Sequence, residues 1–116
     1  MKKLREDGWE AEKVEQTIPK TYIKRDLFNC IDIVAIREGM TLGVQATSIA
    51  HIRDHIEKHN KEPLLYLWLK AKNRFQIWGW AKQGKRGERK TFRLKKFEVR
   101  LRWTNYFLEW HECSTS

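Results

Sequence analysis

The chain has 116 residues, of which 41% are hydrophobic and 34% charged, and its 24 Lys and Arg residues outnumber its 15 Asp and Glu residues by nine. This length and composition predict a single domain, residues 1–116, and exclude a fibrous or disordered chain. The longest apolar stretch, residues 64–69, is far shorter than the ~18 residues of a membrane span, so we expect no membrane partner and a cytoplasmic protein. Cys30 and Cys113 have no disulfide or metal-ligand spacing and are expected to be free thiols.

The first elements in the chain are short. Residues 2–7 are typical of the last turns of a helix that Gly8 closes, because glycine best tolerates the left-handed position after a helix. Residues 9–15 then predict a short strand. Residues 17–25, which include a proline, predict a loop.

A β-hairpin is the strongest structural pattern in the sequence. Two apolar runs rich in β-branched residues, 27–36 and 41–47, flank a short turn that contains Gly39. A turn centred between Glu38 and Gly39 pairs Ile36 with Thr41, Val34 with Gly43 and Asp32 with Gln45. Neither face of the hairpin is predominantly polar, so we expect it to be central in a sheet and covered on both sides.

Two helices and further strands follow the hairpin. Ser48 is a candidate N-cap for a helix with isoleucines at helical spacing, and residues 63–71, apolar nearly all round, predict a second, largely buried helix. Residues 74–80 predict a strand, and residues 97–103 alternate so that one face is apolar and the other cationic. The fold class expected is α/β, with a mixed central sheet flanked by helices.

The positive charge is concentrated in one segment. Residues 70–102 contain 13 basic and two acidic residues, so this segment carries +11, whereas residues 1–69 are neutral. Such a bias favours nucleic acid as partner, with a basic hairpin loop at about residues 82–96 as the main contact; the alternative is that these residues only keep a hairpin soluble. The residues expected to bind nucleic acid are Lys24, Arg25, Lys82, Lys85, Arg86, Arg89 and Lys90.

Asp32 is a carboxylate inside an apolar strand, which is costly unless it is bonded, paired or bound to a metal. Directly opposed strand residues have Cβ atoms ~4.5–5.5 Å apart. The Asp32 carboxylate and the Gln45 amide oxygen could therefore share one hard cation. The alternative is that Gln45 simply donates a hydrogen bond to Asp32.

These residues resemble a known family. The sequence Ile-Asp-Ile-Val-Ala-Ile at 31–36, a tight turn, and Gly-Val-Gln-Ala-Thr-Ser at 43–48 before a helix are similar to the PD-(D/E)XK nuclease superfamily, and within it to small Holliday junction resolvase-like endonucleases of phage and archaeal type. The resemblance implies a restriction-endonuclease-like core of a helix, about four strands and a second helix. It also implies a homodimer that hydrolyses DNA phosphodiester bonds, with branched DNA the suggested substrate and duplex DNA an alternative.

The resemblance also assigns roles to residues. It makes Asp32 a ligand of Mg²⁺ or Mn²⁺, places Gln45 where the family usually has Glu or Asp, and places Thr47 where it usually has a catalytic lysine. The Ala46 carbonyl, Glu15 and Asp26 are candidates to complete the metal site. A neutral amide at Gln45 removes one negative charge, and Thr47 cannot act as a cation. The candidates for a replacement cation are Lys24, Arg25, Arg53 and Lys58.

Three histidines, His51, His55 and His59, recur at a spacing that puts them on one helix face. This spacing can chelate zinc, but without a fourth ligand it favours a solvated or phosphate-facing surface. Two other functions stay open. One is a catalytically inactive nuclease-fold protein that binds nucleic acid, and the other is an assembly protein whose cationic strand meets an acidic partner.

Overall fold

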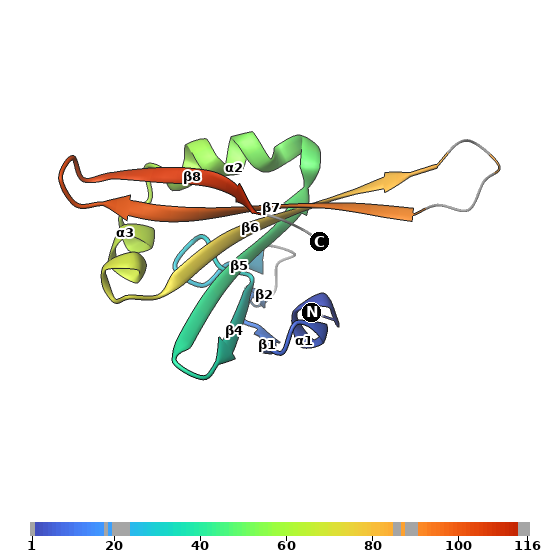
Figure 1. Ribbon diagram of the computed structural model, residues 1–116, viewed down its shortest axis with the longest axis horizontal. Coiled ribbons are helices and arrows are strands. Elements are labelled where there is room, and N and C mark those ends of the chain that lie inside the picture. The colour runs from blue at the N-terminus through green and yellow to red at the C-terminus, as the bar shows by residue number, and fades with distance from the viewer. Residues whose placement is uncertain (1, 18, 20–23, 85–86, 88–90, 114–116) are drawn as a thin grey trace.

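Six strands form one mixed sheet in the order β1-β4-β5-β6-β7-β8 (Figure 1). The computed structural model describes residues 2–17, 19, 24–84, 87 and 91–113. The elements are α1 (Lys2–Glu6), β1 (Glu10–Lys13), β2 (Gln16–Thr17), β3 (Lys24–Arg25), β4 (Ile33–Arg37), β5 (Met40–Ser48), the 3-10 helix η1 (Ile49–His51), α2 (Ile52–His59), α3 (Pro63–Lys70), β6 (Arg74–Gln83), β7 (Thr91–Arg102) and β8 (Phe107–Cys113).

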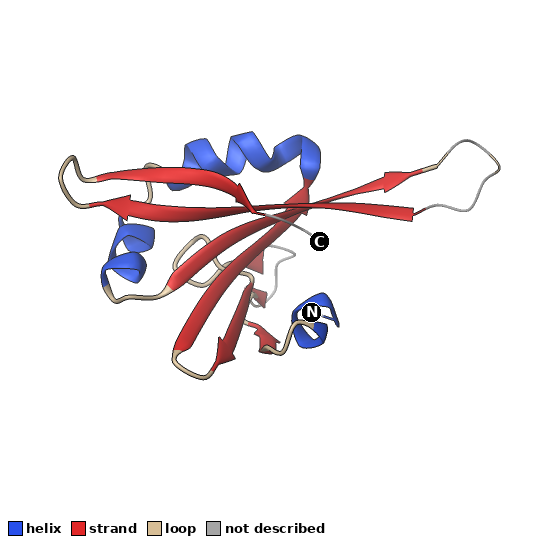
Figure 2. Cartoon of the chain, viewed as in Figure 1, coloured by secondary structure: helices blue, strands red, loops and turns tan. Residues whose placement is uncertain are grey.

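Helices pack on both faces of this sheet (Figure 2). Strands β5 and β6 are parallel and every other neighbouring pair is antiparallel, so a crossover must join β5 to β6, and η1, α2 and α3 supply it. Ile52 of α2 and Leu65 of α3 pack with Phe75 and Ile77 on one face, while Leu4 of α1 packs on the other. The predicted α/β class and mixed sheet are confirmed. No helix in the described part of the chain has the length and apolar character needed to cross a membrane.

The predicted register of the β4–β5 hairpin is confirmed, but the predicted start of its first strand is wrong. Val34 pairs with Gly43 and Ile36 with Thr41, and Gly39 adopts a positive φ of 74° in the turn. Strand β4 begins at Ile33 because residues 27–31 close on themselves as a turn, with Phe28 and Asn29 both at positive φ. This turn carries the side chain of Ile31 to the α2–α3 face, against Gly43, instead of the face of Ile33.

Burial is less complete than the sequence predicts. The middle of β5 is buried on both faces, but Ile36 of β4 is 55% exposed, because no helix among the described residues covers this part of the α2–α3 face. In α3 only Leu65 is buried and Leu67 is 60% exposed, so the expectation of a largely buried helix is wrong. The helix lies at one end of the sheet and packs along a single side (Figure 1).

Several elements lie where none was predicted. The expected loop at residues 17–25 contains a short pairing, in which Gln16 faces Arg25 and Thr17 faces Lys24. The C-terminal segment contains β8, whose mixed polar and apolar residues gave no clear strand pattern. Strands β6 and β7 run further than expected and project together as an arm (Figure 1). Lys82 lies on this arm, and the predicted contacts Lys85, Arg86, Arg89 and Lys90 lie outside the described residues.

Gly79 lets α2 and η1 approach β6 closely. A Cβ at this position would overlap Ile52 Cδ1 and lie 2.8 Å from Ile52 Cγ1 and 3.1 Å from Ile49 Cα. We expect Gly79→Ala to lower the free energy of unfolding by about 1–3 kcal/mol, measured by urea denaturation, because the core would be overpacked. Adding Ile52→Val removes the overlapping methyl group, so the double variant should recover part of the loss; two costs that simply add would contradict this explanation.

Candidate metal centre

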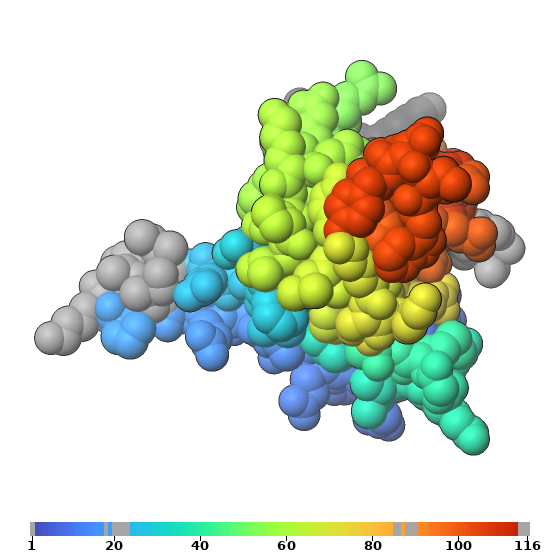
Figure 3. Space-filling model, turned by 90° about the vertical axis from the view of Figure 1, so that its left-hand side faces the viewer, coloured from blue at the N-terminus to red at the C-terminus, as the bar shows by residue number. Residues whose placement is uncertain are grey.

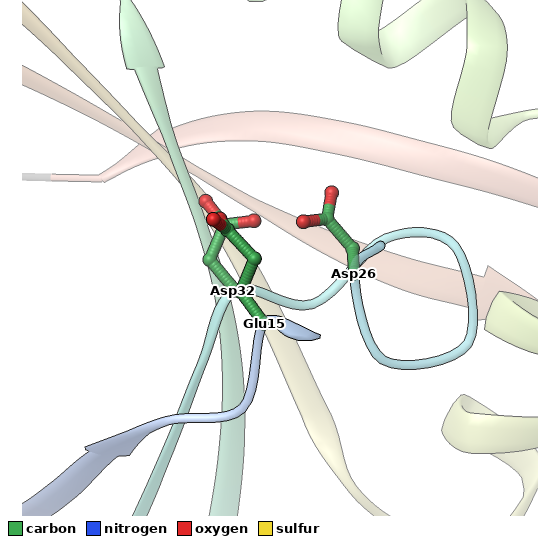
Figure 4. Close-up of side chains that lie close together, drawn as sticks. All are labelled: Glu15, Asp26 and Asp32. Carbon is green, nitrogen blue, oxygen red and sulfur yellow. The ribbon is translucent and has the colours of Figure 1, made fainter. Parts of the chain in front are cut away.

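Three carboxylates, those of Glu15, Asp26 and Asp32, converge beside the start of β4 (Figure 4). One oxygen from each lies within 4.8 Å of the other two, and all three residues are half-buried. Glu15 follows β1, and it reaches Asp32 because the Val14 amide donates to the Asp32 carbonyl at 2.8 Å. Asp26 follows β3, which the pairing with β2 holds near Glu15. The predicted metal residues Glu15, Asp26 and Asp32 are therefore brought together. We call these three residues the carboxylate cluster.

Asp32 is anchored to the next strand. Its Oδ2 accepts a hydrogen bond from the Ala46 amide at 2.8 Å. Burial raises the pKa of Asp32 from its ordinary 3.8 to about 7, and the negative charges of Asp26 and Glu15 act in the same direction, against the lowering effect of the Ala46 amide. Burial therefore disfavours the ionised form of Asp32 more than the Ala46 amide favours it.

Gln45 lies beside the cluster, with its amide nitrogen rather than its oxygen turned toward it. The residue is 4% exposed, and its Nε2 donates to Asp26 Oδ2 at 3.0 Å. Its Oε1 contacts His59 Nε2. The hydrogen bond therefore goes to Asp26, not to Asp32 as the alternative interpretation expected. An oxygen ligand role for Gln45 would require its amide to turn over and lose the bond from His59.

His59 is a buried partner of this amide, and the expected solvated histidine face is wrong at this position. His59 is fully buried and packs edge-on against Phe75 with ring centroids 5.4 Å apart, whereas His51 is exposed beside Asp54. Burial lowers the pKa of His59 to about 4, with the neighbouring His55 and Lys58 contributing in the same direction. The neutral ring therefore donates from Nε2 to Gln45 Oε1. A buried glutamine needs hydrogen-bond partners for both its amide nitrogen and its amide oxygen. The position of Gln45 in an apolar strand was therefore a signal in the sequence that a second polar partner lies nearby.

One predicted replacement cation reaches the cluster. Lys24 Nζ lies 3.4 Å from Glu15 Oε1, and in the described part of the chain no other cation is ion-paired to these three carboxylates. Arg25 is exposed next to Asp26, and Arg53 lines a separate groove with Lys95 on the α2 side of β7. Thr47 is half-buried two residues beyond Gln45, on β5.

The donor set fits a hard divalent cation. Carboxylate oxygens are the ligands that Mg²⁺ and Mn²⁺ prefer, and a cation would offset the negative charge that burial makes unfavourable at Asp32. Gln45 adds a fixed donor that holds one oxygen of Asp26 in place. The arrangement can therefore bind a metal through Asp26, Asp32 and Glu15.

The basic segment carries less free charge than its composition indicates. Among its described residues, Arg74 is ion-paired to Glu98, Lys95 to Glu112, Lys96 to Asp7 and Arg102 to Glu109. Lys82 and Arg93 stay exposed on the projecting arm, and Arg100 is exposed near the opposite end of β7. The side chains available to a polyanion are thus fewer than the net charge of +11 implies.

The Asp32→Asn variant should be more heat-stable than the wild type in metal-free buffer at pH 8, because it removes a charge that burial disfavours. The folded-state pKa of Asp32 lies above its unfolded value, so its contribution to stability is present at low pH and is lost as the pH rises through about 7. The difference in melting temperature should therefore shrink toward pH 5. His59 acts in the opposite direction, losing stability as the pH falls from 6.5 toward 4, but it is common to both proteins. Thermal unfolding followed by circular dichroism in EDTA checks this, and a difference independent of pH would contradict it.

The sheet, its helices and this cluster define an α/β protein with a candidate metal centre at one end of a central hairpin. Comparison with protein-family models, with curated proteins and with solved structures gives no match for the chain.

Proposed function

We propose that this protein is a metal-dependent endonuclease that hydrolyses DNA phosphodiester bonds, with a PD-(D/E)XK-like active site. The observation that carries the proposal is the convergence of Glu15, Asp26 and Asp32 within 4.8 Å, with Asp32 anchored to the amide of Ala46 on the facing strand. Lys24, ion-paired at the edge of the cluster, supplies a cation near the position that a phosphate would take.

The order of elements agrees with this proposal. Helix α1 precedes the antiparallel strands β1, β4 and β5, and a helical crossover then leads to β6, which is parallel to β5. An initial helix, three antiparallel strands, a helical crossover and a fourth, parallel strand support, at the level of element order, the core that the sequence resemblance implies. Strands β7 and β8 extend the sheet beyond that unit.

Asp32, Asp26 and Glu15 would hold Mg²⁺ or Mn²⁺. The Ala46 carbonyl is a further candidate, because the N–H and C=O of one strand residue point to the same side and the Ala46 N–H points to Asp32. When bound, such an ion lowers the pKa of water and offsets the charge that develops on the phosphate.

Hydrolysis forms a bond from the water oxygen to phosphorus and breaks the bond from phosphorus to a sugar oxygen. The sugar oxygen gains one proton, and the other proton of the water passes to solvent. Gln45 keeps Asp26 oriented, and Lys24 can donate to a phosphate oxygen.

The test is a cleavage assay on a four-way junction, the matching duplex and single-stranded DNA, with Mg²⁺, Mn²⁺, Ca²⁺ or EDTA present. We expect cleavage with Mg²⁺ or Mn²⁺ and none with EDTA, and binding that weakens steeply with salt. Absence of cleavage of every substrate with either ion would contradict the proposal. Analytical ultracentrifugation of the protein, alone and with the same substrates, tests the homodimer. Two symmetric cuts on a junction need two active sites.

A catalytically inactive nucleic-acid-binding protein is the second candidate. The sequence resemblance aligns Thr47 with the usual catalytic lysine, and the oxygen of Gln45 is engaged by His59. Salt-sensitive DNA binding that is independent of metal, without cleavage, would favour this function.

A further inference from the structure

A small cavity borders the carboxylate cluster. It has a volume of about 190 Å³, with Leu27, Phe28 and Leu64 forming an apolar wall and Gln16 and Arg25 a polar one. Asp26 lines the cavity and also belongs to the cluster, so the two lie next to each other. In Figure 3 the surface of the turn that contains Leu27 and Phe28 lies directly beside that of α3.

The turn that carries Phe28 is held in an unusual conformation. Phe28 has a φ of 52° and Asn29 a φ of 62°, and a bulky residue such as phenylalanine rarely adopts this left-handed region. The Asn29 side chain donates to Glu62 Oε1 at 3.0 Å, and Glu62 Oε2 accepts from the Leu64 amide at 3.2 Å. The start of α3 thus fixes the turn, which holds Phe28 at the cavity wall although the residue is 42% exposed. Its ring also packs against the ring of Trp68 on α3, with centroids 6.1 Å apart. Strain of this kind is typical of ligand-binding positions.

We propose that this cavity binds one unpaired nucleobase of the DNA strand whose phosphate lies at the carboxylate cluster. The proposal rests on the proposed nuclease function and specifies its substrate class. The cavity is smaller than the about 300–1,000 Å³ of pockets for drug-sized ligands, so it accepts a single ring system.

The chemistry of the walls suits a base in particular. An aromatic ring offers a stacking surface to any base, and Gln16 and Arg25 offer hydrogen-bonding groups to its edge. Lys24 and Arg25 on β3 add positive charge beside the cavity for the strand that carries the base. A base inside a duplex cannot enter such a cavity without leaving its stack, so a strand with an unpaired base next to the cut should be preferred.

The experiment places 2-aminopurine at successive unpaired positions of a forked DNA and measures its fluorescence on binding, with Ca²⁺ used to support binding without cleavage. We expect quenching at one position in the wild type. Phe28→Ala should abolish that quenching and weaken binding of the fork by about 5- to 100-fold, with little effect on a duplex. Phe28→Trp should restore both. Phe107→Ala is the matched control, because Phe107 is 44% exposed on β8 and does not line the cavity.

The outcomes separate this inference from the nuclease proposal. Two results would contradict base binding by the cavity but not the proposed nuclease function. One is metal-dependent cleavage with equal affinity for fork and duplex, and the other is metal-dependent cleavage with a fork affinity that Phe28→Ala does not change. Quenching that depends on Phe28, without cleavage in Mg²⁺ or Mn²⁺, would support base binding in the cavity and contradict the proposed nuclease function. A protein that binds none of these DNAs would overturn both.

Discussion

The Asp32→Asn variant is expected to cleave DNA at least about 100-fold more slowly than the wild type while binding it with similar affinity. Loss of partners that only orient a metal ligand costs about 10- to 100-fold, and Asp32 is proposed as a ligand itself. Asparagine keeps an oxygen that can accept from the Ala46 amide, so the hairpin should stay intact. Single-turnover cleavage of the best substrate, with binding measured in Ca²⁺, checks both parts.

Asp54→Asn provides the control for this variant. Asp54 is an exposed carboxylate on α2 that contacts His51 and lies outside the carboxylate cluster, so the same chemical change there should leave cleavage unaltered. A cleavage rate of Asp32→Asn equal to that of the wild type would show that Asp32 is not a metal ligand of the active site. Equal losses in both variants would point to a general effect of charge on binding.

Replacing His59 should weaken the fold and the metal site together. In His59→Leu an apolar side chain fills the fully buried position of the imidazole, but the buried Gln45 oxygen loses its hydrogen-bond donor. We expect the free energy of unfolding to fall by about 1–3 kcal/mol, the cost of one unsatisfied buried polar group. Without the bond from His59 the Gln45 amide would no longer be fixed in orientation, and its hydrogen bond would no longer fix Asp26 Oδ2. Mn²⁺ affinity should therefore fall by about 10- to 100-fold. Urea denaturation and isothermal titration with Mn²⁺ give the two quantities.

The His59→Gln variant distinguishes orientation from packing. A glutamine amide nitrogen can donate at roughly the position of the imidazole Nε2, so this variant should recover most of the Mn²⁺ affinity even if its stability stays reduced. A purely structural role would instead make Mn²⁺ affinity follow stability in both variants. Wild-type affinity in the Leu variant would show that the His59–Gln45–Asp26 chain has no part in metal binding.

The local patterns in the sequence were enough to predict the hairpin and its register. The turn residues at 38–39 and the two apolar runs determine which residues face each other, because strand pairing propagates from a tight turn. The same patterns failed at residues 27–31, where an apolar composition typical of a strand conceals a turn with two left-handed residues. Asn29, which tolerates that conformation, was the only local sign.

The sequence by itself determined the α/β class, the β4–β5 register and the need of Asp32 for polar partners, since these depend on periodicity, turn chemistry and the cost of a carboxylate in an apolar strand. Only the tertiary structure decided which groups surround Asp32. Glu15 and Asp26 reach it through the β2–β3 pairing and the loops around it, and His59 reaches Gln45 through the crossover helix α2. Such contacts join residues far apart in the chain, and their geometry depends on how strands and helices pack, which no local pattern encodes.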